Sequence, residues 1–342
     1  DNTKYVLERD GTLRFQAADG EGGDWFASAG RMQLRWASGQ ADKRTRRLEG
    51  GWLPIPVITT EYDGIVCTQR VFVVPVDDPG SDPARLNRRA VCVAEFTWSN
   101  LRQDASPVSA GLDILLDNRG ERPAGLAPME GGFRLEADGD VLGSVVVTPS
   151  SDLKLHVSDG RLQLRGTLPP GGSAGFVAIL QPPAGDLPTV GAVSALRRDV
   201  ESHWQAVLAP VMQIDTPDPF LNDLVRSSQV RCLLAARNEA DGAHVAPWIA
   251  AMSYGPYESE AHSVIRGMDF LGHSEFARRG LEFFVHRYNA DGFLTTGYTT
   301  FGTAWHLWTL AQHCELTGDA AWLRAHASQI ARVGDWILRQ LA

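Results

Sequence analysis

The chain has 342 residues, of which 44% are hydrophobic and 21% are charged, and its formal net charge is −9. This composition is typical of a soluble globular protein that is long enough for two domains. The acidic balance argues against a nucleic-acid-binding module, and no apolar run approaches the ~18 residues that a membrane span requires.

The first 185 residues are predicted to form strands. Short or alternating apolar runs recur through this region, and turn clusters such as Asp138-Gly139 separate them. Many strands without a helical period favour one large antiparallel β-sandwich as the first domain, over residues 1–185. The runs are Arg31–Trp36, Ile65–Val74, Ala90–Trp98, Ala110–Leu116, Val141–Thr148, Leu153–Val157, Arg161–Leu164 and Gly175–Leu180.

A helical period replaces the strand pattern after Pro182-Pro183. Residues 186–214 are predicted to form a helical linker, because apolar residues from Val193 to Val207 share one stripe. Residues 215–342 are expected to be helical throughout. The five predicted helices run from Asp218-Pro219 to about Asn238, from Gly255-Pro256 to Gly272, from a cap at Ser274 to about Asn289, from a cap at Thr303 to Gly318, and from a cap at Asp319 to the C-terminus.

The connections between these helices alternate in length. The loops Glu239–Gly255 and Ala290–Gly302 are long, whereas Gly272-His273 and Gly318 leave only one or two residues for a turn. Short turns join antiparallel neighbours, so both long loops are expected to emerge at the same end of the helix array. We call this the long-loop end. It is the predicted working face, because loops on a rigid scaffold often carry function.

Aromatic residues alternate with hydroxyl and glycine residues at the long-loop end. Sugar rings have apolar faces and hydroxyl rims, so this mixture favours a carbohydrate ligand. Some of the aromatics are expected to pack the inner helices instead, and His306 fits a hydrogen-bond donor to substrate as well as a structural histidine. The predicted substrate-binding residues are Trp248, Tyr254, Tyr257, Glu260, Tyr298, Trp305 and His306.

Glu258 is the candidate catalytic residue. At ~100° per residue, Glu258, His262 and Asp269 share one side of their helix. We therefore expect Glu258 at the border between core and cavity, where it would bind substrate or act as one of two catalytic carboxylates. The structural alternative is a favourable interaction with the helix dipole.

The cysteines and histidines show no metal-type spacing, and we expect no metal and no cofactor. Cys67, Cys92, Cys232 and Cys314 all lie in apolar segments. Buried free thiols are therefore expected, with a Cys67–Cys92 disulfide as the alternative. The cysteines do not decide the cellular compartment, and a secreted or periplasmic location is favoured over a cytoplasmic one.

Five short stretches of the helical half carry a resemblance to a known family: Thr216–Asn222, Tyr257–Ala261, Gly267–Gly272, Asp291–Leu294 and His313–Asp319. Through them, residues Asp215–Leu341 resemble the six-hairpin glycosidase superfamily. The resemblance implies that the chain is a multidomain β + α protein: an N-terminal β-sandwich, a linker helix, and only the first helices of an (α/α)6 toroid. Tyr257-Glu258 stands where the family often carries an Arg-Asp pair that grips the sugar.

The same resemblance implies a carbohydrate-active enzyme, in the first place an inverting glycoside hydrolase that acts on an oligo- or polysaccharide. Such enzymes use two carboxylates about 6.5–9.5 Å apart. The family's general acid lies on a later hairpin, so further polypeptide is expected to complete the toroid. The alternatives are a glycoside phosphorylase, which the absence of lysine from residues 189–342 disfavours, a non-catalytic carbohydrate-binding protein, and a polysaccharide lyase.

Overall fold

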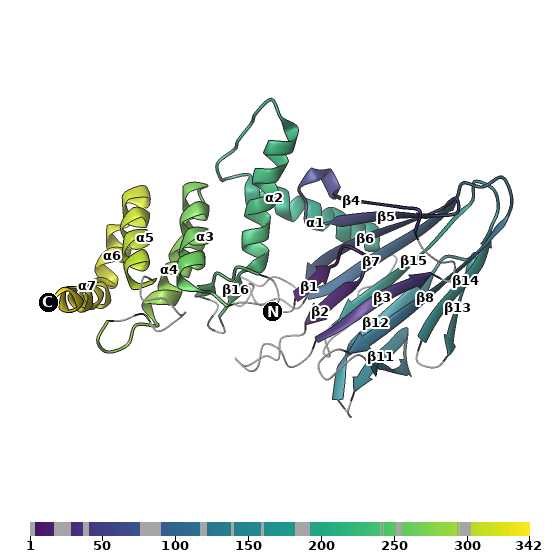
Figure 1. Ribbon diagram of the computed structural model, residues 1–342, viewed down its shortest axis with the longest axis horizontal. Coiled ribbons are helices and arrows are strands. Elements are labelled where there is room, and N and C mark those ends of the chain that lie inside the picture. Colours follow the sequence, from purple (N-terminus) through teal and green to yellow (C-terminus); the bar gives the residue numbers. More distant parts are fainter. Residues whose placement is uncertain are drawn as a thin grey trace. The chain divides into compact units, whose positions relative to one another are not determined.

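The structure is a computed structural model of the 342-residue chain. The chain divides into two compact units, which are described separately (Figure 1): the described residues up to His203 belong to the first, and those from Trp204 onward belong to the second. The described residues are 4–16, 29–36, 41–75, 90–116, 122–137, 140–158, 161–181, 192–239, 241, 243–250, 255–292, 294 and 302–342.

The first unit contains two large antiparallel sheets. One has the strand order β1-β2-β3-β8-β14-β13, with β9 paired to β8, and the other has the order β10-β11-β12-β15-β7-β6-β5-β4. The predicted antiparallel sheets are thus confirmed. The strands are β1 Lys4–Leu7, β2 Leu13–Gln16, β3 Ala29–Trp36, β4 Lys43–Leu48, β5 Pro56–Tyr62, β6 Ile65–Pro75, β7 Ala90–Asn100, β8 Ser106–Leu116, β9 Arg122–Pro123, β10 Gly125–Met129, β11 Gly132–Ala137, β12 Asp140–Pro149, β13 Leu153–Ser158, β14 Arg161–Leu168 and β15 Ser173–Gln181, with a 3-10 turn at Glu49–Gly51.

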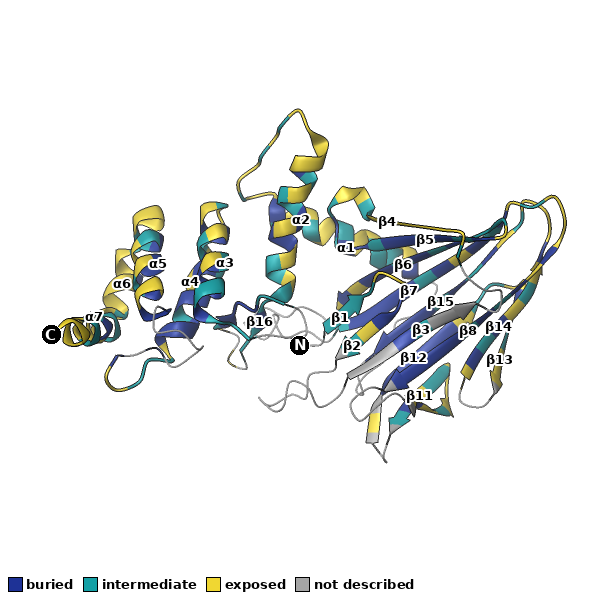
Figure 2. Ribbon diagram, viewed as in Figure 1, coloured by how far each residue is buried: buried dark blue, intermediate teal, exposed yellow. Residues whose placement is uncertain are grey.

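One continuous hydrophobic core lies between the two sheets. Leu112 and Leu162 contribute to it from one sheet, and Phe96 and Phe176 contribute from the other. The rings of Phe96 and Phe176 stack with centroids 4.5 Å apart. Figure 2 shows the buried residues concentrated on the central strands, such as β7 and β15. The buried side chains of the two sheets therefore pack face to face in a sandwich.

All four cysteines are free thiols. The register of β6 and β7 places Cys67 opposite Trp98 and Cys92 opposite Val73, so the alternative of a Cys67–Cys92 disulfide is wrong. Both of these thiols are buried, and burial raises their pKa. Cys232 and Cys314 are only partly buried, which corrects the expectation for that pair.

The second unit is built mainly from helices. The linker helix α1, Val193–Leu208, contains the division between the two units. A short ladder joins β16 Arg237–Asn238, at the predicted end of the first of these helices, to β17 Val245–Ala246 in the first long loop, although no strand was predicted in this half of the chain. The other helices are α2 Pro219–Ala235, α3 Glu258–Phe270, α4 Ser274–Val285, α5 Gly302–Thr317, α6 Ala320–Ala325 and α7 Ala327–Leu341. No helix among the described residues is long and apolar enough to cross a membrane.

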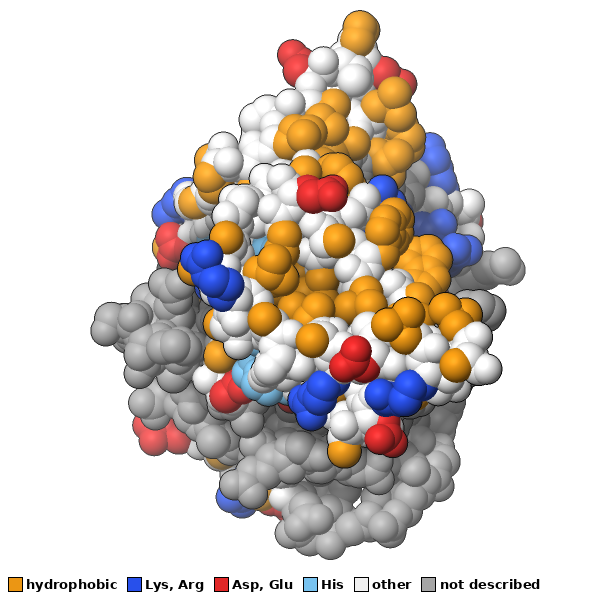
Figure 3. All heavy atoms as spheres, turned by 90° about the vertical axis from the view of Figure 1, so that its left-hand side faces the viewer, with side chains coloured by type: hydrophobic (Ala, Val, Ile, Leu, Met, Phe, Trp, Pro, Cys, Tyr) orange, Lys and Arg blue, Asp and Glu red, His pale blue; other side chains and the backbone are white. Residues whose placement is uncertain are grey.

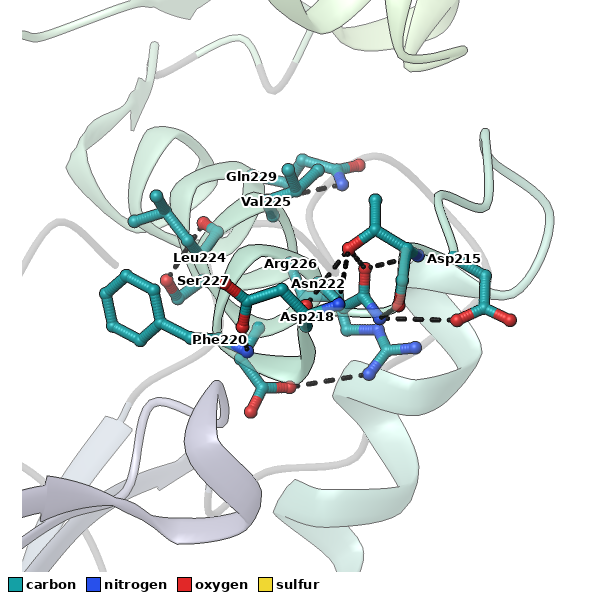
Figure 4. A network of polar contacts seen from close by, with 11 residues as sticks. Asp215, Asp218, Phe220, Asn222, Leu224, Val225, Arg226, Ser227 and Gln229 are labelled. Carbon is teal, nitrogen blue, oxygen red and sulfur yellow. Dashed lines mark hydrogen bonds and ion pairs between the residues drawn. The ribbon is translucent and has the colours of Figure 1, made fainter.

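Side-chain caps fix the start of α2. The Asp218 carboxylate accepts a hydrogen bond of 2.9 Å from the backbone N–H of Phe220, and Pro219 occupies the first turn. The buried Asn222 side chain accepts from the backbone N–H of Thr216 at 2.8 Å and donates to the Asp215 carboxylate at 3.2 Å. Figure 4 shows this network around the helix start. Asp319 caps α6 in the same way, as predicted.

Several predicted helix limits are wrong, among them the end of α4, which stops at Val285 and not near Asn289. His273, and not Ser274, occupies the N-cap position of α4. Thr303 lies inside α5, and its hydroxyl accepts a hydrogen bond of 3.3 Å from the backbone N–H of Leu294 instead of capping the helix. The last predicted helix is broken at His326, which separates α6 from α7.

The contribution of buried hydrogen bonds to the stability of the sandwich can be tested at the fully buried Asn100. Its amide nitrogen lies 2.8 Å from the carbonyl oxygen of Asp104 and 3.0 Å from that of Leu168, and donates to both. Asn100→Asp removes these donors, so we expect the free energy of unfolding to fall by about 3 kcal/mol in urea denaturation. Gln163→Glu makes the same chemical change on the solvent side of β14, beside Arg165, and should be nearly neutral. Equal effects of the two substitutions would contradict this account.

Candidate functional site

Helices α3 and α5 lie side by side and run in the same direction (Figure 1). Glu258 contacts Gly302 at their starts. One turn further, His262 Nε2 lies 2.7 Å from His306 Nδ1, and near the other end the Asp269 carboxylate lies 2.8 Å from His313 Nδ1. Each hydrogen-bonded pair is separated by 44 residues. The starts of both helices therefore lie at the same end, as the alternating loop lengths predict.

Glu258 is the first residue of α3, and only 2% of it is exposed. A methyl group at position 302 would lie 1.7 Å from Glu258 Cγ, so glycine is required there for the close approach of the two helices. His262 and Asp269 share this buried side of α3, as the helical period predicts. Glu258 nevertheless lies deeper than the border position expected from the sequence, because α5 packs directly against it.

A pair of buried histidines lies next to Glu258. His262 Nδ1 contacts the backbone carbonyl oxygen of Glu258, and the ring of Phe284 packs 4.4 Å from the His262 ring. Burial lowers the pKa of His262 to about 4, against the opposing effect of the Glu258 carbonyl. Burial, together with the neighbouring His262, holds the pKa of His306 well below its ordinary value. Both rings are therefore neutral at neutral pH.

Arg237 was not predicted as a site residue. It is 2% exposed, and its guanidinium carbon lies 3.8 Å from the ring centroid of Trp248, in the cation–π range. Burial lowers the pKa of Arg237 to about 10. Trp248 is itself buried, so this predicted sugar platform is covered by a guanidinium group. The sequence carries no local signal for the pair, because the β16–β17 ladder brings the two residues together.

The other predicted site residues are more scattered. Tyr257 is half-buried at the N-cap position of α3, and the Glu260 carboxylate accepts a hydrogen bond of 2.5 Å from the Ser259 hydroxyl. Trp305 is 40% exposed and packs edge-on against Trp308. Tyr254 and Tyr298 lie outside the described residues. The structure thus brings together Glu258, His262 and His306, and their substrate contacts remain a prediction.

A second polar pair joins α3 and α5 away from the long-loop end. Asp269 and His313 are both buried, and the Trp322 ring packs edge-on to His313 at 5.3 Å. Sequence reasoning placed Asp269 on the correct side of its helix but did not predict its partner. Within the part of the chain that the structure describes, no three His, Cys, Asp or Glu side chains are arranged to hold a metal ion.

The contact at Gly302 predicts a large difference between two glycine substitutions. We expect Gly302→Ala to reduce the free energy of unfolding by about 1–3 kcal/mol, because the new methyl group would overlap the Glu258 side chain. Gly267→Ala is the matched control in α3, since a methyl group there meets nothing within 4 Å. It should stabilise the protein by about 0.5–1 kcal/mol. Thermal melting of both variants measures the difference, and a stabilising Gly302→Ala would disprove the close contact.

The lowered pKa of His262 predicts a loss of stability in acid. An unfolded histidine has a pKa of about 6.5, so between pH 6.5 and about 4 the unfolded state binds more protons than the folded state. The free energy of unfolding should therefore fall as pH falls through this window, by about 3 kcal/mol from this group. Urea denaturation at several pH values should show a shallower dependence for His262→Gln than for the wild type. His156→Gln, at an exposed position of β13, should leave the dependence unchanged.

Comparison with known proteins assigns no family to this chain. No protein-family model matches the sequence, and a search of curated proteins finds no similar one. Its function is therefore inferred from the residues that α3 and α5 bring together at the long-loop end.

Proposed function

We propose that the chain is part of a carbohydrate-active enzyme, in the first place an inverting glycoside hydrolase acting on an oligo- or polysaccharide. The observation that carries the proposal is the shared start of α3 and α5, where Glu258 is buried against Gly302 and the hydrogen-bonded pair of neutral imidazoles, His262 and His306, lies one turn further along. The sequences that lead into both helix starts are rich in aromatic, hydroxyl and glycine residues. This combination suits a ligand with apolar ring faces and many hydroxyl groups.

Glu258 is proposed to bind the substrate through hydrogen bonds to sugar hydroxyl groups. A carboxylate accepts hydrogen bonds from two hydroxyl groups, and such charge-assisted bonds are stronger than neutral ones. Its burial and its packing against Gly302 hold the side chain in place, which favours positioning of the substrate over a mobile role in proton transfer. An inverting hydrolase needs a second carboxylate across the scissile bond, and the proposal assigns it to further polypeptide.

An exposed apolar surface supports the proposed further polypeptide. Phe270 of α3 and Trp308 and Leu316 of α5 are each more than 40% exposed, and the Arg266 guanidinium lies over the Trp308 ring at 4.4 Å. Figure 3 shows hydrophobic side chains gathered on the face that lies at the left of Figure 1. Exposed apolar patches commonly mark interaction surfaces. Trp305 lies closer to the start of α5 and remains a candidate for stacking on a sugar ring.

The test is Glu258→Gln in the complete enzyme, assayed for release of reducing sugar from a panel of oligo- and polysaccharides. The substitution keeps the size of the side chain and removes charge-assisted hydrogen bonds of about 1.5–3 kcal/mol each. We expect kcat/KM to fall at least about tenfold, while the loss of the dipole interaction lowers stability by only about 0.3–1 kcal/mol. Glu275→Gln is the control, since Glu275 occupies the exposed first turn of α4; it should show the same small stability change and normal turnover.

The same assay separates the alternatives. Turnover that requires inorganic phosphate identifies a glycoside phosphorylase, and sugar binding without any turnover identifies a carbohydrate-binding protein. Unchanged kcat/KM in Glu258→Gln would remove Glu258 from the site, because a purely structural glutamate affects the melting temperature alone.

A further inference from the structure

Two buried polar groups at the long-loop end are candidates for hydrogen bonding to a ligand. His306 Nε2 and the Tyr288 hydroxyl have no hydrogen-bond partner among the residues that the structure describes. The two rings pack edge-on with centroids 5.3 Å apart. Tyr288 follows α4 and is fixed by a β-bridge to Leu294, whereas His306 lies on the first turns of α5. A buried polar atom without a partner lowers stability by about 1–3 kcal/mol, so such a pair is a candidate for binding a ligand.

The neighbouring hydrogen bonds fix which atom of His306 can donate. A carbonyl oxygen only accepts, so His262 Nδ1 must carry a proton and donate it to the Glu258 carbonyl. A neutral imidazole has one ring proton, which leaves His262 Nε2 as an acceptor. His306 Nδ1 must then be the donor across the 2.7 Å contact. No proton remains for His306 Nε2, so this atom presents a lone pair.

The surroundings keep both rings neutral. His262 and His306 are fully buried, and Phe284 packs against both of them. The desolvation that accompanies this burial disfavours an imidazolium ion. The ring of Tyr288 packs edge-on against His306, and its buried hydroxyl can donate or accept a hydrogen bond.

We propose that His306 Nε2 and the Tyr288 hydroxyl form a two-point recognition site for one hydroxyl group of a sugar or another polyol. The ligand hydroxyl donates to His306 Nε2 and accepts from Tyr288. A carbonyl, carboxylate or ether oxygen cannot donate and is rejected, because it would face the lone pair of His306. His306 is thus a hydrogen-bond acceptor toward its ligand, and not the donor that the sequence suggested. The choice of a sugar rests on the proposed function, whereas the acceptor role of His306 does not.

The tautomer is tested first, by side-chain 15N–1H NMR of the uniformly labelled full chain at neutral pH. We expect both His262 and His306 to carry their proton on Nδ1, with an unprotonated Nε2. His262→Gln and His306→Gln assign the signals, and Tyr288→Phe offers an assignment that keeps the ring packing if either histidine variant fails to fold. A proton on His306 Nε2, or an imidazolium ring, would overturn the inference whether or not the protein acts on sugars.

The ligand is tested by titrating glucose, mannose, galactose and xylose, with sodium acetate as an oxygen ligand that cannot donate. We expect at least one sugar to shift the His306 Nε2 signal, acetate to leave it unchanged, and Tyr288→Phe to weaken the sugar affinity at least about tenfold. Sugar binding that leaves this signal and the Tyr288→Phe affinity unchanged would refute the site and leave the proposed function standing. If none of the sugars binds and the complete enzyme turns over no carbohydrate, the proposed function fails, and the sugar assignment fails with it.

Discussion

The helical unit depends on the close approach of α3 and α5 at Gly302. A glycine at this point lets the Glu258 side chain lie directly against the backbone of the neighbouring helix. The same register then pairs His262 with His306 and Asp269 with His313, so one backbone contact aligns polar groups along the whole helix pair. A side chain at position 302 would separate the helices and lengthen both hydrogen bonds. The site is therefore a consequence of packing and not of a local motif.

Polar pairing inside this interface has a chemical consequence. Two helices that met only through apolar residues would be equally stable or more so, because buried polar groups gain little over well-packed apolar ones. Here the pairs instead give a defined direction to each hydrogen bond. The carbonyl of Glu258 sets the tautomer of His262, and His262 sets that of His306. A neutral, oriented acceptor is thereby held in surroundings of low dielectric, where hydrogen bonds are strong.

The outer elements hold this pair in place by different means. The short turn between α3 and α4 includes Gly272, whose positive φ of 94° ends the helix. The β16–β17 ladder and the Arg237–Trp248 contact fasten the first long loop. The carboxylate of Glu282 accepts a hydrogen bond of 2.5 Å from the Trp322 indole, and this bond joins α6 to α4. These contacts hold the described parts of the helical unit around α3 and α5, which suits a binding face on a rigid scaffold.

The sequence alone determined the features that depend on short windows of the chain. Alternating apolar residues specify the strands of the sandwich, the 3.6-residue period specifies the helices, and the carboxylates of Asp218 and Asp319 cap helices within three residues of themselves. The alternation of loop lengths was enough to place the starts of α3 and α5 at one end, and the helical period placed Glu258 and His262 on one side of α3. Only the tertiary structure decided which residues meet across helices, because a contact over 44 residues leaves no trace in local periodicity. It showed that His262 faces His306 and that Arg237 covers Trp248, since each contact depends on packing against another element.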